Sequence, residues 1–137
     1  MFRILGQIEV YGSKSDIDLC ASIALIEGGV IKQIGLKRKI PDTDSWYYAS
    51  PLYCFNRNRI DEEIHNFIAS CSRIGEGISA SGIKEAFFTL YPIDQSFDEM
   101  LSCVFSNETI TLISSLGIGL QIAPEVTMPD APYWVLR

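Results

Sequence analysis

The chain has 137 residues, close to the commonest size of one domain, so we expect one hydrophobic core and no second domain. Its residues are 47% hydrophobic and 20% charged, a composition that excludes an intrinsically disordered chain. The net charge of −6, from 17 acidic and 11 basic side chains, argues against nucleic-acid binding and favours a cationic partner.

The chain begins with a segment that predicts a strand followed by a helix. Residues 2–10 alternate apolar and polar side chains, with Gly6 in the inward row, which is typical of a half-buried strand. The helix that follows has Ser13 or Ser15 as its N-cap and acidic residues in its first turn. We expect Gly28 and Gly29 to end it.

The middle of the chain predicts a hairpin and then the longest helix. The β-branched run at 30–36 and the aromatic run at 46–49 predict two paired strands. Apolar residues at helical spacing predict one helix over 60–74, followed by a loop or a short helical turn at 75–82. The remaining regular segments are, in chain order, a strand at 86–91 that Pro92 stops, a strand at 100–105, a helix from Ser106 or Asn107 to Gly117, and a strand at 118–122.

This order, βαββαββαβ, predicts an α+β fold with a mostly antiparallel sheet and about three helices on one face. We expect one domain over residues 1–137. Prolines at 124, 129 and 132 exclude a regular helix at the end of the chain, so residues 123–137 are expected to form an extended arm.

Several features of residues 2–122 form a recognisable pattern: an opening strand with an acidic first helix, then Gly35, Trp46 and Ser50, then Asp61-Glu62-Glu63-Ile64-His65, and last the segment from Leu112 to Ile122. This pattern resembles a family of bacterial domains of unknown function, number 4279. The proline-containing arm departs from it. Some members of that family are similar to immunity proteins encoded beside polymorphic toxins, so the resemblance implies inhibition of a toxin by direct binding. It carries no functional residue to this chain.

The residue types that most enzyme chemistries need are scarce. His65 is the only histidine, so a cysteine or serine nucleophile has one candidate base. Cys71 follows it by six residues, about 600° of helical rotation, which places the two side chains on different faces. The cysteines show neither a C-x-x-C pair nor zinc-ligand spacing. We therefore expect a protein that is not an enzyme and that uses no metal or cofactor.

The sequence also predicts where the protein resides. Its apolar runs are strand-sized, far short of the roughly 20 residues that cross a bilayer, and its first residues lack the features of a signal peptide. We expect a cytosolic protein whose cysteines are buried thiols, at Cys20, Cys54, Cys71 and Cys103.

Acidic and aromatic side chains are the best candidates for partner contacts, because aromatic anchors and acidic rims suit binding to a basic protein. They are Asp42, Asp44, Trp46, Tyr47, Tyr133 and Trp134. The sequence leaves other interpretations open. Trp46 and Tyr48 on one strand face could be ordinary core, and the chain could instead be a small-ligand or regulatory domain with a pocket between sheet and helices, or an enzyme that uses carboxylates alone.

Overall fold

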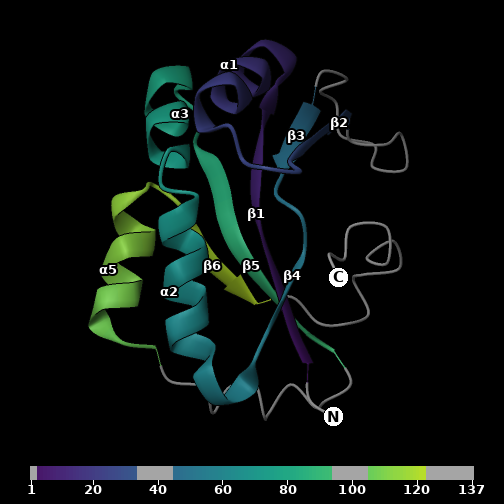
Figure 1. Ribbon diagram of the computed structural model, residues 1–137. Helices are drawn as coiled ribbons and strands as arrows, with labels where there is room; N and C mark the ends of the chain where they lie inside the picture. The colour runs from purple at the N-terminus through teal and green to yellow at the C-terminus, as the bar shows by residue number, and fades with distance from the viewer. Residues whose placement is uncertain (1–2, 34–44, 94–104, 123–137) are drawn as a thin grey trace.

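The computed structural model describes residues 3–33, 45–93 and 105–122 (Figure 1). These residues form a six-stranded sheet in which β4 pairs with β1 beside the main strand order β2-β3-β1-β5-β6. The β5–β6 pair is parallel and the other pairs are antiparallel. The strands are β1 (Arg3–Ser13), β2 (Val30–Gln33), β3 (Ser45–Ala49), β4 (Tyr53–Phe55), β5 (Glu85–Ile93) and β6 (Gly119–Ile122).

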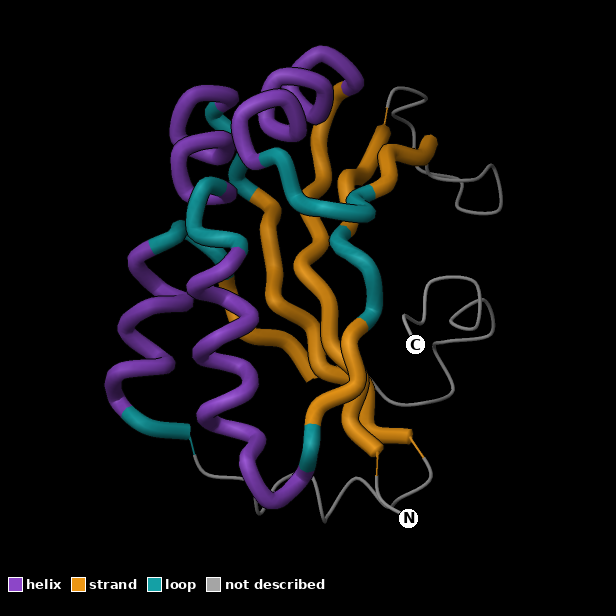
Figure 2. The backbone as a smooth tube through the Cα atoms, in the orientation of Figure 1, coloured by secondary structure: helices purple, strands orange, loops and turns teal. Residues whose placement is uncertain are grey.

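The helices lie on one face of this sheet, as predicted (Figure 2). They are α1 (Lys14–Ala24), α2 (Ile60–Ser70), α3 (Ile74–Ser81) and α5 (Asn107–Ser115), with a 3-10 turn η1 (Arg57–Arg59) before α2. The prediction of an α+β fold with a mostly antiparallel sheet is confirmed, while the described part of the chain has four α-helices and not three. No helix of this part is long and apolar enough to span a membrane.

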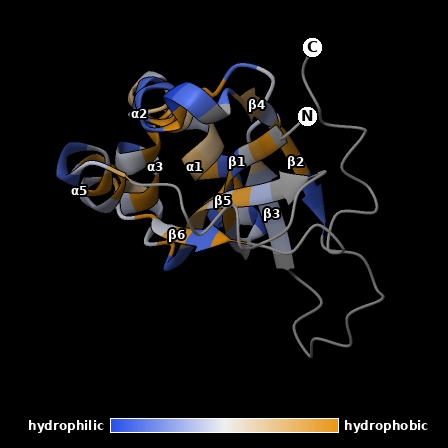
Figure 3. Ribbon diagram, turned by 90° about the horizontal axis from the view of Figure 1, so that it is seen from below, coloured by the Kyte–Doolittle hydropathy of each residue, from blue (hydrophilic) through white to orange (hydrophobic). Residues whose placement is uncertain are grey.

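The core fills the space between the helices and the sheet, where Figure 3 shows hydrophobic residues on the inner sides of both layers. On the sheet side it consists of the even-numbered residues of β1 and β5, because successive side chains of a strand point to opposite faces. Fully buried members include Ile4, Ile8, Phe88 and Leu90 from the sheet and Ile64 and Ile68 from α2.

The single helix predicted at 60–74 is wrong, because a turn at residues 71–73 separates α2 from α3. In this turn the Ile74 N–H donates to the Cys71 carbonyl at 2.9 Å, and both residues are buried. The glycine-rich α3 has a weak intrinsic preference for helix, but it packs closely on α1. A Cβ atom on Gly77 would lie 2.7 Å from the Cys20 carbonyl oxygen, so only glycine permits this approach.

The predicted serine caps are confirmed. The Ser13 side chain accepts from Asp16 N–H at the start of α1, and Ser106 accepts from Thr109 N–H at the start of α5. The predicted end of the first helix is wrong, because α1 ends at Ala24 and Leu25 takes the left-handed cap position with φ 49°. The Leu25 N–H donates to the Ala21 carbonyl at 3.0 Å, which satisfies one of the last helical acceptors before the glycines.

The sequence did not predict β4, which continues the path of β3 along β1 after an interruption at Ser50. The Ser50 Oγ accepts from the Ile8 N–H, and the Ser50 carbonyl accepts from Gln7 Nε2, both at 2.9 Å. At the interruption, a regular strand would have offered a backbone carbonyl to the buried Ile8 N–H. The Ser50 hydroxyl accepts this hydrogen bond instead, so the Ile8 N–H is satisfied.

Pro92 does not stop the strand at 86–91, because β5 continues to Ile93. Pro92 pairs with Ile4 of β1, whereas the described β6 reaches only Leu90 of β5 on the other side. A proline lacks the N–H that a second neighbouring strand would need, and β5 has only one described neighbour at this point. At 100–105, Phe105 lies outside any strand and residues 100–104 lie outside the described residues.

Candidate binding site

The second face of the sheet, which no described helix covers (Figure 3), is lined by tyrosines whose hydroxyls bind one carboxyl group. We call Glu9, Tyr11, Tyr47, Phe87 and Tyr91 the tyrosine face. Register places them together, since Glu9 lies opposite Phe87 and Tyr11 lies opposite Tyr47. The four aromatic side chains are half-buried and Glu9 is 7% exposed.

The carboxyl group of Glu9 is held by two phenols. The Tyr11 hydroxyl donates to Glu9 Oε2, and the Tyr91 hydroxyl donates to Glu9 Oε1. Burial raises the pKa of Tyr91 above its ordinary value, and the adjacent Glu9 carboxyl raises it further because a phenolate beside it would be repelled. Tyr91 therefore stays a hydrogen-bond donor well above neutral pH, and it fixes the orientation of the carboxyl group.

Aromatic contacts extend the cluster across three strands. The ring centroids of Tyr11 and Tyr47 are 6.1 Å apart, and those of Tyr11 and Phe87 are 6.4 Å apart. These separations lie in the range of favourable aromatic pairs. Exposed charges flank the cluster, with Glu85 opposite Tyr11 and Lys32 opposite Tyr47. The result is a rigid, amphipathic surface whose polar groups are preorganised.

Polar side chains beside the cluster are also paired. Gln7 is 3% exposed and bonds to Ser50, and Thr89 Oγ1 donates to Gln121 Oε1 at 3.3 Å. In the described part of the chain, no buried side-chain nitrogen or oxygen atom lacks a hydrogen-bond partner. Burying a polar group costs little folding free energy when the group is hydrogen-bonded. This face of the sheet can therefore bury polar side chains, whereas the helix-covered face of the sheet buries apolar ones.

Of the six predicted partner-contact residues, the structure describes Trp46 and Tyr47 and places them on opposite faces. Tyr47 belongs to the tyrosine face, whereas Trp46 packs against the core and holds the Lys14 ammonium 5.0 Å from its ring centroid. Tyr48 is buried, and its hydroxyl accepts from the Ile26 N–H at 2.9 Å, so Trp46 and Tyr48 are core residues. The remaining four lie outside the described residues: Asp42, Asp44, Tyr133 and Trp134.

Sequence reasoning missed Glu9, Tyr11, Phe87 and Tyr91. The alternation in residues 2–10 did indicate that Glu9 points away from the helices, but it predicted a solvated position. Only the pairing of β1 with β3 and β5 brings the tyrosines to Glu9, and a sequence pattern within one strand contains no information about that register.

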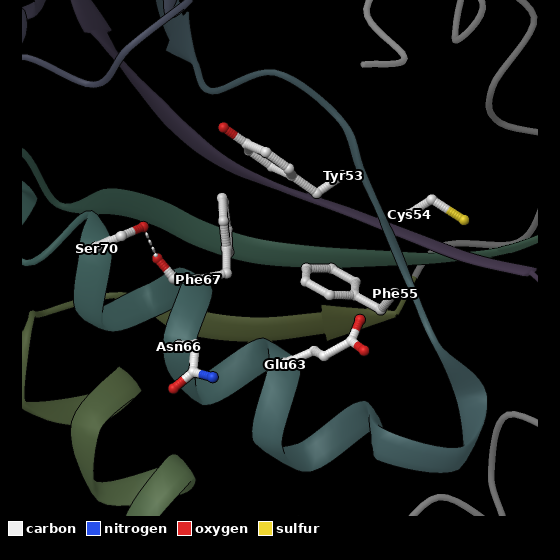
Figure 4. A pocket seen from close by; sticks show the side chains of 7 residues that line it. All are labelled: Tyr53, Cys54, Phe55, Glu63, Asn66, Phe67 and Ser70. Atoms are coloured by element: carbon white, nitrogen blue, oxygen red, sulfur yellow. Dashed lines mark hydrogen bonds between the residues drawn. The ribbon is translucent and has the colours of Figure 1, made fainter. Parts of the chain in front are cut away.

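A second concave feature lies between β4 and α2, and Figure 4 shows its lining. We call it the β4–α2 groove. Its volume is about 350 Å³, near the lower limit of the roughly 300–1,000 Å³ of small-molecule sites. The rings of Tyr53 and Phe67 are 4.6 Å apart, and those of Phe55 and Phe67 are 5.7 Å apart. The lining residues are Tyr53, Cys54, Phe55, Glu63, Asn66, Phe67 and Ser70.

The cysteines behave differently from the prediction at one position. Cys20 and Cys71 are buried as expected, and burial raises the pKa of Cys20 to about 11 and also raises that of Cys71. Cys54 of β4 is exposed, because its side chain points away from the rings of the groove (Figure 4). Cys103 lies outside the described residues.

The other chemistry-bearing side chains are dispersed. His65 is partly exposed on α2. Desolvation acts to raise the pKa of Asp61, but hydrogen bonds from Ser106 and Thr109, with a smaller contribution from nearby His65, lower it below its ordinary value. Among the residues that the structure describes, no group of three or more His, Cys, Asp or Glu side chains could hold a metal ion.

A scan against protein-family models, a search of curated proteins and a search of solved structures each found no match to this chain. The tyrosine face and the β4–α2 groove are therefore judged by their own geometry.

Proposed function

We propose that this chain is a non-catalytic cytosolic protein-binding module, and most concretely an immunity protein that neutralises a cognate bacterial toxin by direct binding. The observation that carries the proposal is the tyrosine face: four half-buried aromatic side chains around a phenol-bound carboxyl group, on a sheet face without a described helix. Tyrosine supplies large contact area at a small cost in conformational entropy, and it is enriched in interface hot spots.

Electrostatics support a cationic partner. The net charge of −6 accelerates association with a basic protein through long-range attraction, and such attraction weakens as salt screens it. An inhibitor needs only to cover the active site or the substrate-binding surface of its target, so it requires no catalytic residues of its own.

The first experiment is a tagged pull-down from the source cells at low and then moderate salt, with the activity of any captured protein assayed. We expect one stoichiometric partner whose activity is inhibited and whose retention falls as salt rises. Capture of no partner while the neighbouring genes are expressed, or capture of a partner whose activity is unaffected, contradicts the immunity proposal.

The contact surface is tested on the captured complex. Tyr47→Ala removes one ring of the tyrosine face, and we expect an affinity loss of at least about tenfold, or about 1.4 kcal/mol. Leu19→Ala is the control, because Leu19 is 44% exposed on α1, in the helical layer. Equal affinity of the two variants contradicts the assignment of the interface to this face.

A small-ligand domain is the alternative function, and the β4–α2 groove is the observation that favours it. A thermal-shift screen separates the two functions: a metabolite that raises the melting temperature in a saturable manner, with no protein captured, favours the ligand function.

A further inference from the structure

The β4–α2 groove combines an aromatic floor with one negative side chain. Tyr53 and Phe55 come from β4 and Phe67 comes from α2, and Figure 4 shows the three rings gathered between the strand and the helix. Phe55 and Phe67 are 5% and 8% exposed, so the core holds them in place. The groove is therefore a preformed feature whose walls belong to two regular elements.

The polar lining comes from one side of α2. Glu63, Asn66 and Ser70 follow each other at spacings of three and four residues, which places them on one helical face. Ser70 Oγ donates to the Phe67 carbonyl at 2.6 Å. The Asn56 N–H donates to Glu63 Oε1 at 2.9 Å, and this bond anchors the carboxylate at the end of the groove.

Glu63 gives the groove a negative charge, and Arg59, which is not among the lining residues, acts on it only at a distance. None of the seven lining residues is cationic. Arg59 pairs with Glu62 at 2.7 Å, whereas among the side chains that the structure describes none forms an ion pair with Glu63. Burial raises the pKa of Tyr53, and the nearby Cys71 and Glu27 raise it further, so a second carboxylate acts on the tyrosine end of the groove.

We propose that the β4–α2 groove binds the guanidinium side chain of an arginine carried by a protein partner. The half-buried ring of Tyr53 would contact the aliphatic stem and the planar cation, with the buried ring of Phe67 packed against it, and Glu63 would accept the hydrogen bonds of the guanidinium. A guanidinium stacks flat on aromatic faces and pairs with carboxylates in a fork geometry, whereas a lysine ammonium acts as a compact point charge without that fork. The inference rests on the proposed function, because it names the chemistry by which a basic protein partner is recognised.

The probe is a short blocked peptide, Gly-Gly-Arg-Gly-Gly, titrated into the ¹⁵N-labelled full chain and followed by NMR. We expect saturable shifts of the Tyr53, Asn66 and Ser70 amides with a dissociation constant on the order of 1 mM. The same peptide with citrulline in place of arginine has the same shape without the charge, and we expect at least about fivefold weaker binding. Equal binding of the two peptides overturns the proposal.

Two charge-matched variants locate the contact. Glu63→Gln removes the carboxylate but keeps an oxygen that can accept from the Asn56 N–H, and we expect at least about fivefold weaker binding of the arginine peptide. Glu62→Gln removes the same charge from the neighbouring position, where Arg59 already pairs with it, and we expect a change within about twofold. Similar losses of peptide affinity in both variants would show that the peptide responds only to the net charge of the protein. That result would overturn the groove as the binding site.

A variant that binds the peptide more tightly cannot owe this result to a failure to fold. Asn66→Asp adds a carboxylate to the exposed lining, and we expect tighter binding of the arginine peptide, by about threefold. Asn58→Asp adds the same charge in η1, outside the groove, and we expect no tightening. No change with Asn66→Asp contradicts the proposal.

Further titrations distinguish the source of the cation. A lysine peptide that binds as tightly as the arginine peptide overturns the guanidinium preference. Free agmatine that binds at least about tenfold more tightly than the peptide would indicate a small-amine site and overturn the protein partner. The titration needs no captured protein, whereas the proposed function is tested by capture of a partner whose activity is inhibited, so failure of the groove and failure of the proposed function give different results.

Discussion

The two faces of the sheet bury their side chains by different means. The helix-covered face is closed by α1, α2, α3 and α5, and its central residues are aliphatic or aromatic. On the opposite face of the sheet, Glu9 of the tyrosine face and the adjacent Gln7 and Thr89 are almost fully buried, and each has a hydrogen-bond partner. Apolar burial stabilises the first face, whereas a satisfied polar network specifies the second.

This difference suggests that alternate residues of each strand have different roles. Residues of one parity hold the protein together, and their neighbours of the other parity are available for recognition. The four predictions that follow test this division, from the largest expected effect to the smallest.

The sharpest test uses two adjacent phenylalanines of β5. Phe88 is fully buried under the helices, so Phe88→Ala should lower the free energy of unfolding by about 3–5 kcal/mol through lost burial and a cavity. Phe87 is half-buried on the tyrosine face, so Phe87→Ala should cost less than about 1.5 kcal/mol. Urea denaturation of both variants measures the difference, and similar losses would show that the two faces are equally important for stability.

The polar network is tested with Glu9→Gln. A glutamine replaces one acceptor oxygen by an N–H donor, so one tyrosine hydroxyl loses its acceptor and the other loses a charge-assisted bond, at a cost of about 1–2 kcal/mol in the free energy of unfolding. Glu85→Gln is the control, because Glu85 is exposed on the same face opposite Tyr11. That variant should change stability by less than about 0.5 kcal/mol. If Glu9→Gln is as stable as the control, the network does not contribute to folding.

The pH dependence follows from the tyrosines. The pKa of Tyr91 is raised in the folded protein, so its contribution to stability is complete below the unfolded value of about 10 and is lost as the pH rises above it. Tyr91 should therefore give stability no pH dependence near neutral pH, and stability should fall above about pH 10. We expect absorbance at 295 nm to report tyrosinate together with unfolding, and a smaller alkaline loss in Tyr91→Phe. Tyrosinate formation well before unfolding would contradict this prediction.

The smallest effect, with no change in stability, concerns the thiols. Cys54 is exposed and should react with a maleimide in the native state, whereas Cys20 and Cys71 are buried and should react only when the structure opens. Peptide mapping by mass spectrometry after a short pulse identifies each site. Labelling of Cys20 at the rate of Cys54 would show that α1 and α3 separate readily.

Much of the fold could be predicted from local patterns. The strand at the amino terminus, the hairpin partners, the serine caps and the apolar face of α2 all follow from periodicity and capping within a few residues. The division of the long helix into α2 and α3 could not be predicted in this way. It depends on the approach of Gly77 to Cys20, which lie more than 50 residues apart in the sequence. This packing of α3 on α1 stabilises a helix in a glycine-rich segment whose own helix propensity is weak.

The candidate site could be predicted less completely. Aromatic residues in an acidic chain suit a protein interface, and for this reason the sequence selects both Tyr47 and Trp46 as partner contacts. Tyr47 lies on the tyrosine face, where its contact with a partner stays a prediction, whereas Trp46 lies on the core side of the same strand. The groove was not predicted, since β4 has only three residues and exists through its pairing with β1.

The sequence by itself determined most of the helices and strands, because side-chain periodicity and caps act over a few residues, but it determined neither β4 nor the division between α2 and α3. Only the tertiary structure decided which side chains share a face. Glu9, Tyr47 and Tyr91 meet through the register of β1 with β3 and β5, and that register depends on how the whole apolar set is buried. The physical reason is that a one-residue shift in any pair would move every side chain of a strand to the opposite face.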